Sequence, residues 1–243
     1  MRIGIISDIH NNILALDRTL NYFEANNCKK IICYGDIIGI GPFPEETVRR
    51  VMSLDNLICV KGNHEDYLIN AIDNKPFPVS MESEEAKHHI WEHSLLSEKS
   101  KEFLIHLPRE KTISAYGINI LVIHYSMGSK NNYNNAVQNL TLCQCEQMFD
   151  SIDADMVIFG HSHKQSVHQN AKTHYINIGS LGCPAKSKNV ARAGMLNLED
   201  GKVIFENVEL IYDVSAVIAE IDRLRYPASS EIKQIFYGLW EKK

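Results

Sequence analysis

Residues 1–10 read MRIGIISDIH, and the rest of the chain follows the pattern that this stretch sets. Arg2–Ile6 is a short apolar run that predicts a β-strand, and Asp8 and His10 follow it directly. Two residues apart in an extended chain, a carboxylate and an imidazole point to the same side. An oxygen and a nitrogen ligand on one face, at the end of a strand, favour a site for a divalent metal.

Four later segments place polar side chains in the same way, and each comes after or at the end of a predicted apolar strand. The predicted strands span residues 31–34, 57–60, 118–123 and 156–159. The segments that follow them are Gly35-Asp36, Gly62-Asn63-His64-Glu65, His124 and Gly160-His161-Ser162-His163. Together with Asp8 and His10 they form one set of candidate ligands.

Helices separate the first three strands. Apolar residues at helical spacing predict a helix over residues 11–26, and Pro44 opens a second one over 45–52. Apolar strands that alternate with helices indicate an α/β fold with a parallel sheet buried on both faces. Ligands of such sheets gather at the carboxyl ends of the strands, where these motifs lie.

Residues 66–110 interrupt the alternation, and we interpret them as a helical insertion with helices over 82–96 and 98–107. Its four histidines are expected to be surface or capping residues, with a metal role as the less favoured alternative: His88, His89, His93 and His106. Beyond the insertion we expect a helix over 138–149, a strand over 174–178, a hairpin of 193–198 with 202–210, and closing helices over 214–225 and 230–240.

Composition narrows the class of function. The chain has 243 residues, 44% of them hydrophobic, and a net charge of −5, which argues against long nucleic acids and anionic membranes as partners. The six cysteines are scattered, and no apolar run is long enough for a signal peptide or a membrane span. We therefore expect a cytoplasmic protein with reduced thiols.

The ordered pattern D-x-H, G-D, G-N-H-[DE], H and G-H-x-H, between residues 5 and 163, resembles the calcineurin-like metallophosphoesterase superfamily. SDIHNNILAL, GDIIGIGPFPEETV and INIGSLGCP look like a small bacterial and archaeal, phosphodiesterase-like branch of it. The resemblance implies an α/β fold of the four-layer α+β type: two packed mixed β-sheets flanked by helices, with a dinuclear metal site at the carboxyl ends of strands. It implies one domain over residues 1–243.

The resemblance also assigns roles to the candidate ligands. Asp8, His10 and His163 bind the first metal. Asn63, His124 and His161 bind the second. Asp36 bridges both, and His64 is the general acid for the leaving oxygen. The mixed oxygen and nitrogen ligands suit Mn, which we favour, with Fe or Zn as alternatives.

The expected activity is hydrolysis of small phosphodiesters or dinucleoside polyphosphates by in-line attack of a metal-bridging hydroxide. The alternatives are a serine/threonine phosphoprotein phosphatase, a nuclease for short oligonucleotides, and a non-catalytic interaction scaffold. Tyr125 and Lys164-Gln165 depart from the family pattern, and we expect both at the pocket edge, where they bear on the leaving group. Apolar faces on the closing helices offer a surface for pairing two chains.

Overall fold

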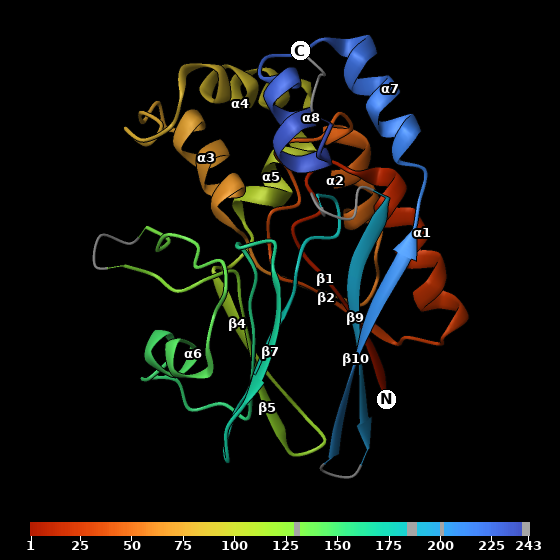
Figure 1. The fold of residues 1–243 in the computed structure, drawn as a ribbon, viewed down its shortest axis with the longest axis vertical. Helices are drawn as coiled ribbons and strands as arrows, with labels where there is room; N and C mark the ends of the chain where they lie inside the picture. Colours follow the sequence, from red (N-terminus) through yellow and green to blue (C-terminus); the bar gives the residue numbers. More distant parts are fainter. Residues whose placement is uncertain (129–131, 184–188, 200–201, 240–243) are drawn as a thin grey trace.

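Two five-stranded β-sheets face each other in the computed structural model, which describes residues 1–128, 132–183, 189–199 and 202–239 (Figure 1). The first sheet has the order β10-β9-β1-β2-β3. Its strands are β1 (Arg2–Ile6), β2 (Lys30–Cys33), β3 (Leu57–Cys59), β9 (Val190–Glu199) and β10 (Lys202–Ile211). β1, β2 and β3 run parallel, as predicted, and the antiparallel β9–β10 hairpin adds to the edge at β1.

The second sheet has the order β4-β5-β6-β8-β7 and is also mixed. Its strands are β4 (Glu110–Ala115), β5 (Ile118–Ile123), β6 (Met156–Ile158), β7 (Gln165–Gln169) and β8 (His174–Ile178). β7 was not predicted, because this edge strand is polar, with exposed and half-buried residues alternating along it.

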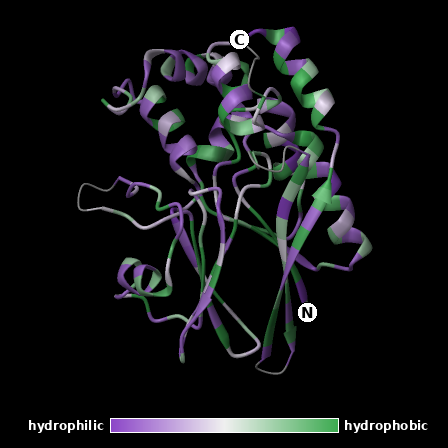
Figure 2. Cartoon of the chain, viewed as in Figure 1, coloured by the Kyte–Doolittle hydropathy of each residue, from purple (hydrophilic) through white to green (hydrophobic). Residues whose placement is uncertain are grey.

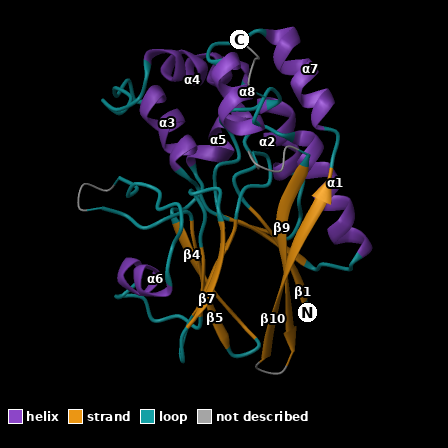
Figure 3. Ribbon diagram, viewed as in Figure 1, coloured by secondary structure: helices purple, strands orange, loops and turns teal. Residues whose placement is uncertain are grey.

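Apolar side chains fill the space between the sheets. Ile3, Ile5 and Ile32 of the first sheet belong to the same buried cluster as Val122 and Ile158 of the second. Each sheet buries its other face under helices, so the molecule has four layers (Figure 3). The expected α/β arrangement of two packed mixed sheets flanked by helices is confirmed.

Most helices cover the first sheet and the end of the molecule toward which β1 runs (Figure 1). They are α1 (Ile13–Ala25), α2 (Pro44–Met52), α3 (Asn63–Ile72), α4 (Ser83–Leu95), α5 (Glu98–Ile105), α7 (Val214–Leu224) and α8 (Ser229–Tyr237). α6 (Leu142–Met148) lies against the second sheet. α7 alternates polar and apolar residues (Figure 2) and buries Val217 and Ile221, as expected of a helix with one face on the core.

The predicted helices agree with the structure to within a few residues at each end, except that α3 was not predicted. α3 begins at Asn63, inside the Gly62-Asn63-His64-Glu65 motif that was assigned to a strand end. Glu65 accepts a hydrogen bond from the amide of Gly62 at 2.7 Å, which caps the first turn. None of the helices in the described residues is both long and apolar enough to cross a membrane.

Candidate metal centre

The loops after the strands, rather than the strands themselves, orient the side chains of the candidate ligands. β1 ends at Ile6, and both Asp8 and His10 have a φ of 49°. The expectation that an extended chain directs this pair was therefore wrong, although both side chains do reach the site. Asp36, His161 and His163 also have positive φ, which is uncommon outside glycine and marks backbone held by its surroundings. The amides of Asp8 and His10 donate to the carbonyls of Gly35 and Asp36 at 3.0 and 3.1 Å.

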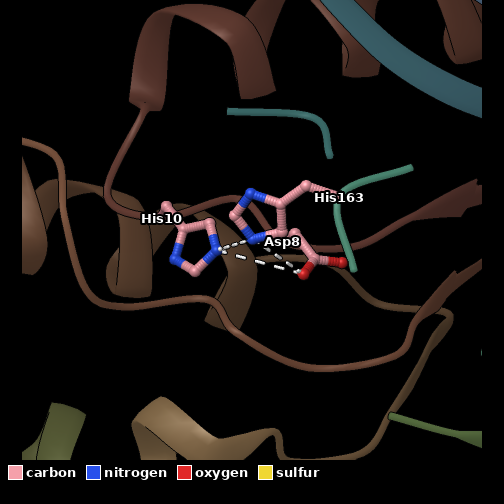
Figure 4. A group of neighbouring side chains, drawn as sticks. All are labelled: Asp8, His10 and His163. Atoms are coloured by element: carbon pink, nitrogen blue, oxygen red, sulfur yellow. Dashed lines mark hydrogen bonds and ion pairs between the residues drawn. The ribbon is translucent and has the colours of Figure 1, made fainter. Parts of the chain in front are cut away.

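One group of donors consists of Asp8, His10 and His163 (Figure 4). His163 Nε2 lies 3.3 Å from Asp8 Oδ1 and 2.8 Å from His10 Nε2. His10 Nε2 lies 3.9 Å from the same Asp8 oxygen. The three side chains come from loops more than 150 residues apart and point at one another, as the ligands of one cation do.

A second group gathers beside the first. His124 Nε2 lies 3.1 Å from Asn63 Oδ1 and 3.3 Å from Asp36 Oδ2. His161 completes a set of three donors with Asp36 and His124. Asp36 Oδ2 also lies 3.9 Å from His10 Nε2, so this carboxylate stands between the two groups.

Backbone carbonyls fix the orientation of two of the histidine rings. His10 Nδ1 pairs with the carbonyl of Ile38 at 3.1 Å, and His124 Nδ1 with that of Tyr34 at 2.8 Å. When such a ring is neutral, it donates its Nδ1 proton to the carbonyl and keeps its Nε2 lone pair, which is how metal-ligating histidines are held.

The donor set fits divalent cations. Both oxygens of Asp8 are buried without a hydrogen-bond partner, as is Nδ1 of His161. A buried carboxylate without a partner is costly unless a cation neutralises it. Burial lowers the pKa of His10 and of His161 to about 4, so both rings are neutral at pH 7 and their lone pairs are available.

The negative charge of Asp36 raises the pKa of His124, whereas burial lowers the pKa of His10 and of His161. Burial alone would lower the pKa of His124, but Asp36, followed by Asp8, raises it to about 10. Burial would likewise raise the pKa of Asp36, yet His124 and His64 hold it well below 3.8. In the absence of metal, His124 therefore carries a proton that a cation must displace.

His64, the expected general acid, lies beside both groups. Its Nε2 is 4.0 Å from Asp36 Oδ2, and its ring centroid is 4.9 Å from that of His10. Burial lowers the pKa of His64 well below 6.5, while Asp36 acts to raise it. The sequence-predicted residues are thus brought together: seven candidate ligands and His64.

Glu65 supports the site in a way that the sequence analysis did not assign. Its Oε2 accepts from the amides of Gly62 and Asp36 at 2.7 and 3.0 Å, and its Oε1 from those of Ile37 and Ile38 at 2.8 and 3.3 Å. This carboxylate therefore ties the loop that carries Asp36 to the start of α3. The acidic position of the G-N-H-[DE] pattern marks Glu65 in the sequence, but the pattern does not show which backbone amides its carboxylate binds.

Close packing explains the glycine before His161. A Cβ on Gly160 would lie 2.5 Å from a ring carbon of Tyr34 and 2.7 Å from Asp8 Oδ2. Only glycine lets this loop approach the Asp8 carboxylate so closely.

The expectation of surface or capping histidines in the insertion was wrong for three of the four. His88, His89 and His93 are buried on α4 around Glu92, which is itself fully buried. His106 is exposed at the end of α5, and its Nδ1 pairs with the carbonyl of Glu102 at 2.7 Å, as a capping residue would. The 3.6-residue period did not separate buried from exposed histidines, because the buried stripe of α4 is polar.

Two cavities open at the centre and meet at Asn63 and His161, which line both. The first, the Phe236 cavity, has a volume of about 580 Å³. Its other lining residues include Lys164, Gln165, Arg192 and Phe236. The second, the Tyr133 cavity, has about 680 Å³. Its other lining residues include Lys61, Asp66, Tyr67, Arg109 and Tyr133.

The two departures from the family pattern differ in position. Lys164 and Gln165 do lie at the edge of the Phe236 cavity. Tyr125, in contrast, is fully buried behind His161, and its hydroxyl accepts from the amide of Val137 at 3.0 Å. Tyr125 therefore packs the second sheet instead of facing substrate.

Comparison with known proteins adds the family. Residues 1–201 match the family model of the calcineurin-like phosphoesterase superfamily domain. The chain belongs to this superfamily. The expected class, a metallophosphoesterase, is thereby confirmed.

Relatives cover nearly the whole phosphoesterase chain. An uncharacterised protein of Methanocaldococcus jannaschii is 27% identical over 245 residues, with 93% of each chain covered. A hypothetical protein from Pyrococcus horikoshii has a similar structure, with a TM-score of 0.83, 16% identity and 98% of each chain covered. A metallophosphoesterase from Sphaerobacter thermophilus has a TM-score of 0.75 and 24% identity, covering 98% of this chain and 99% of its own. At these identities the two structures support the fold.

Proposed function

We propose that this phosphoesterase hydrolyses small phosphodiesters or dinucleoside polyphosphates at a two-metal centre. The observation that carries the proposal is two neighbouring groups of donors, with Asp36 Oδ2 3.3 Å from His124 Nε2 in one and 3.9 Å from His10 Nε2 in the other, at the junction of two cavities. A phosphodiester has a substituent on each side of phosphorus, and the two cavities offer room for one on each side. Their volumes are typical of sites for small ligands.

The residues present would hold the two cations in the way that the sequence suggests. Asp8, His10 and His163 would bind one ion, and Asn63, His124 and His161 the other. Asp36 would contact both, and we favour Mn over Fe or Zn. Bound cations supply positive charge for the phosphoryl oxygens and lower the pKa of water.

His64 is proposed to give the proton to the departing oxygen. Its Nε2 lies 4.0 Å from Asp36 Oδ2 and the residue lines the Phe236 cavity, so the proton can leave Nε2 and pass to the leaving group. Burial disfavours the charged ring, but Asp36 and an anionic substrate favour it, because negative charge nearby stabilises imidazolium.

Cationic side chains favour phosphate groups in both cavities. Lys164 lines the Phe236 cavity, as does Arg192, which pairs with Glu209 at 3.1 Å. Lys61 lines the Tyr133 cavity, as does Arg109, which pairs with Asp66 at 2.6 Å. Tyr133 adds an aromatic ring, over which Arg109 lies 5.8 Å from the ring centroid. These features suit a substrate that carries charge or a ring beyond the reacting phosphate.

We also propose that residues 1–243 act as one domain, with the helical insertion at about 66–110 as part of it, and that the protein is cytoplasmic. The six cysteines are unpaired, which agrees with a reducing compartment. Pairing of two chains through the closing helices stays a prediction.

Turnover of bis-p-nitrophenyl phosphate and p-nitrophenyl phosphate by metal-stripped protein, with and without added Mn, tests the proposal. We expect Mn-dependent cleavage of the diester, and a loss of more than about 100-fold in Asp36→Asn, which removes the shared carboxylate. Asp153→Asn is the matched control, because Asp153 is exposed and pairs with Lys172 on the surface. Cleavage of the monoester alone would favour a phosphatase, and full activity of Asp36→Asn would overturn the proposal.

A further inference from the structure

The helical insertion carries a buried ionisable cluster whose role in the site is not explained by metal binding to the seven candidate ligands. His89 is 1% exposed and Glu92 is fully buried, both on α4, which packs against α3. Groups of this kind are rarely buried unless they are paired or used. Their contacts lead directly to the candidate centre.

Glu92 joins the two loops that carry metal-site residues. Its Oε2 accepts from Asn11 Nδ2 at 2.8 Å and from the amide of Gly39 at 2.7 Å. Asn11 directly follows His10 in the chain, and Gly39 lies on the loop after Asp36. The second oxygen, Oε1, pairs with His89 Nδ1 at 2.7 Å.

Glu92 thereby sets the tautomer of His89. A carboxylate only accepts, so His89 Nδ1 carries the proton that this contact shares, and in the neutral form of the ring Nε2 keeps a lone pair. This Nε2 is buried without a hydrogen-bond partner. In the neutral ring it is an acceptor without a donor.

The nearest catalytic side chain is His64. Its ring centroid lies 5.1 Å from that of His89, and donor atoms of His64, His89 and Glu92 all lie within 4.8 Å of one another. His64 Nδ1 is also buried without a partner. A Cβ on Gly39 would collide with this Nδ1, so this side of the ring lies against the loop that Glu92 holds. The opposite nitrogen, Nε2, is the one that faces Asp36.

We propose that His89, fixed by Glu92, is a positioning residue that accepts a hydrogen bond from His64 Nδ1 through one water, and so keeps His64 Nε2 directed at the leaving oxygen. When the charged ring gives its Nε2 proton to that oxygen, the neutral ring retains Nδ1–H and its water-mediated link to His89. The inference rests on the proposed function, because it assigns His64 a proton to give.

The same three side chains could instead be read as a cation site, but the contacts favour positioning. Glu92 already accepts three hydrogen bonds, from Asn11, Gly39 and His89, and a cation on its oxygens would have to displace some of them. The metal content of a His89 variant therefore distinguishes a cation site from a positioning role.

The test compares diesters with good and poor leaving groups. p-Nitrophenolate departs without a proton, whereas phenolate gains from one, so general acid catalysis matters more for diphenyl phosphate than for bis-p-nitrophenyl phosphate. We expect His89→Ala to lower kcat for diphenyl phosphate about 10-fold or more beyond its effect on the nitrophenyl diester. Added imidazole and the His89→Gln variant, which keeps a hydrogen-bonding group, should restore part of the difference.

His106→Ala is the control. His106 lies in the same insertion but is exposed at the end of α5, where its Nδ1 pairs with the carbonyl of Glu102 at 2.7 Å. It should affect both diesters to the same extent, and urea unfolding shows whether the variants are folded. Metal content of His89→Ala should equal that of the wild-type protein.

An equal loss for both diesters in folded His89→Ala and His89→Gln, or loss of one bound metal, would overturn the positioning role. Wild-type protein that cleaves neither diester with Mn bound would instead overturn the proposed function, so the two failures are distinct.

Discussion

Replacing Glu65 by Gln should destabilise the whole protein, although the two side chains have nearly the same shape. The carboxylate accepts four backbone hydrogen bonds, two on each oxygen, from Gly62, Asp36, Ile37 and Ile38. A glutamine has one carbonyl oxygen and one NH₂ group, so in either orientation one pair of amide donors faces another donor. Two buried donors left without an acceptor cost about 2–6 kcal/mol together.

Urea denaturation followed by circular dichroism measures this loss. Burial, followed by the charge of Asp36, raises the pKa of Glu65 to about 7, so at pH 8 the carboxylate is charged and its burial costs stability. Gln does not carry this cost, which offsets part of the loss. We therefore expect the urea midpoint at pH 8 to fall by about 0.5 M or more, given a slope of about 2–3 kcal/mol/M for a chain of this class.

The matched control is Glu24→Gln, because Glu24 is exposed on α1. Such surface substitutions change stability by less than about 0.5 kcal/mol. If Glu65→Gln shifted the midpoint no more than Glu24→Gln, the four amide contacts would not be what holds the Asp36 loop.

Two further outcomes follow from the geometry. Because Asp36 raises the pKa of His124 to about 10 in the metal-free protein, metal binding must displace a proton. Calorimetry in buffers of different ionisation enthalpy should show proton release at pH 7 and an Mn affinity that rises with pH. An Mn affinity independent of pH would contradict this charge state. Gly160→Ala places a methyl group 2.7 Å from Asp8 Oδ2. It should weaken Mn binding about 10-fold or more, because the methyl group displaces the Asp8 carboxylate. Unchanged Mn binding would show that this carboxylate has room to move.

The sequence predicts that these side chains meet, because its signals are local. Each ligand motif follows an apolar run, and parallel strands bring their carboxyl ends to one edge, so Asp8, Asp36 and Asn63 were expected to meet before their distances were known. The resemblance then supplied the pairing of ligands into two groups. The geometry agrees with that pairing, since Asp8 lies with His163 and Asp36 lies with His124.

The parts that were missed depend on long-range contacts. The left-handed backbone of Asp8 and His10 is held by the carbonyls of Gly35 and Asp36, which lie 27 and 26 residues away along the chain. No local sequence pattern predicts this conformation. The burial of His89 likewise depends on Glu92 reaching Gly39, 53 residues distant. Side-chain composition alone makes α4 look like a solvated helix.

Crystals of the protein soaked in Mn provide the most direct test of the central claim, through an anomalous difference map. We expect two peaks about 3.5–4 Å apart, one beside Asp8, His10 and His163, the other beside Asn63, His124 and His161, with Asp36 between them. A single peak, or peaks away from these side chains, would contradict the two-metal centre.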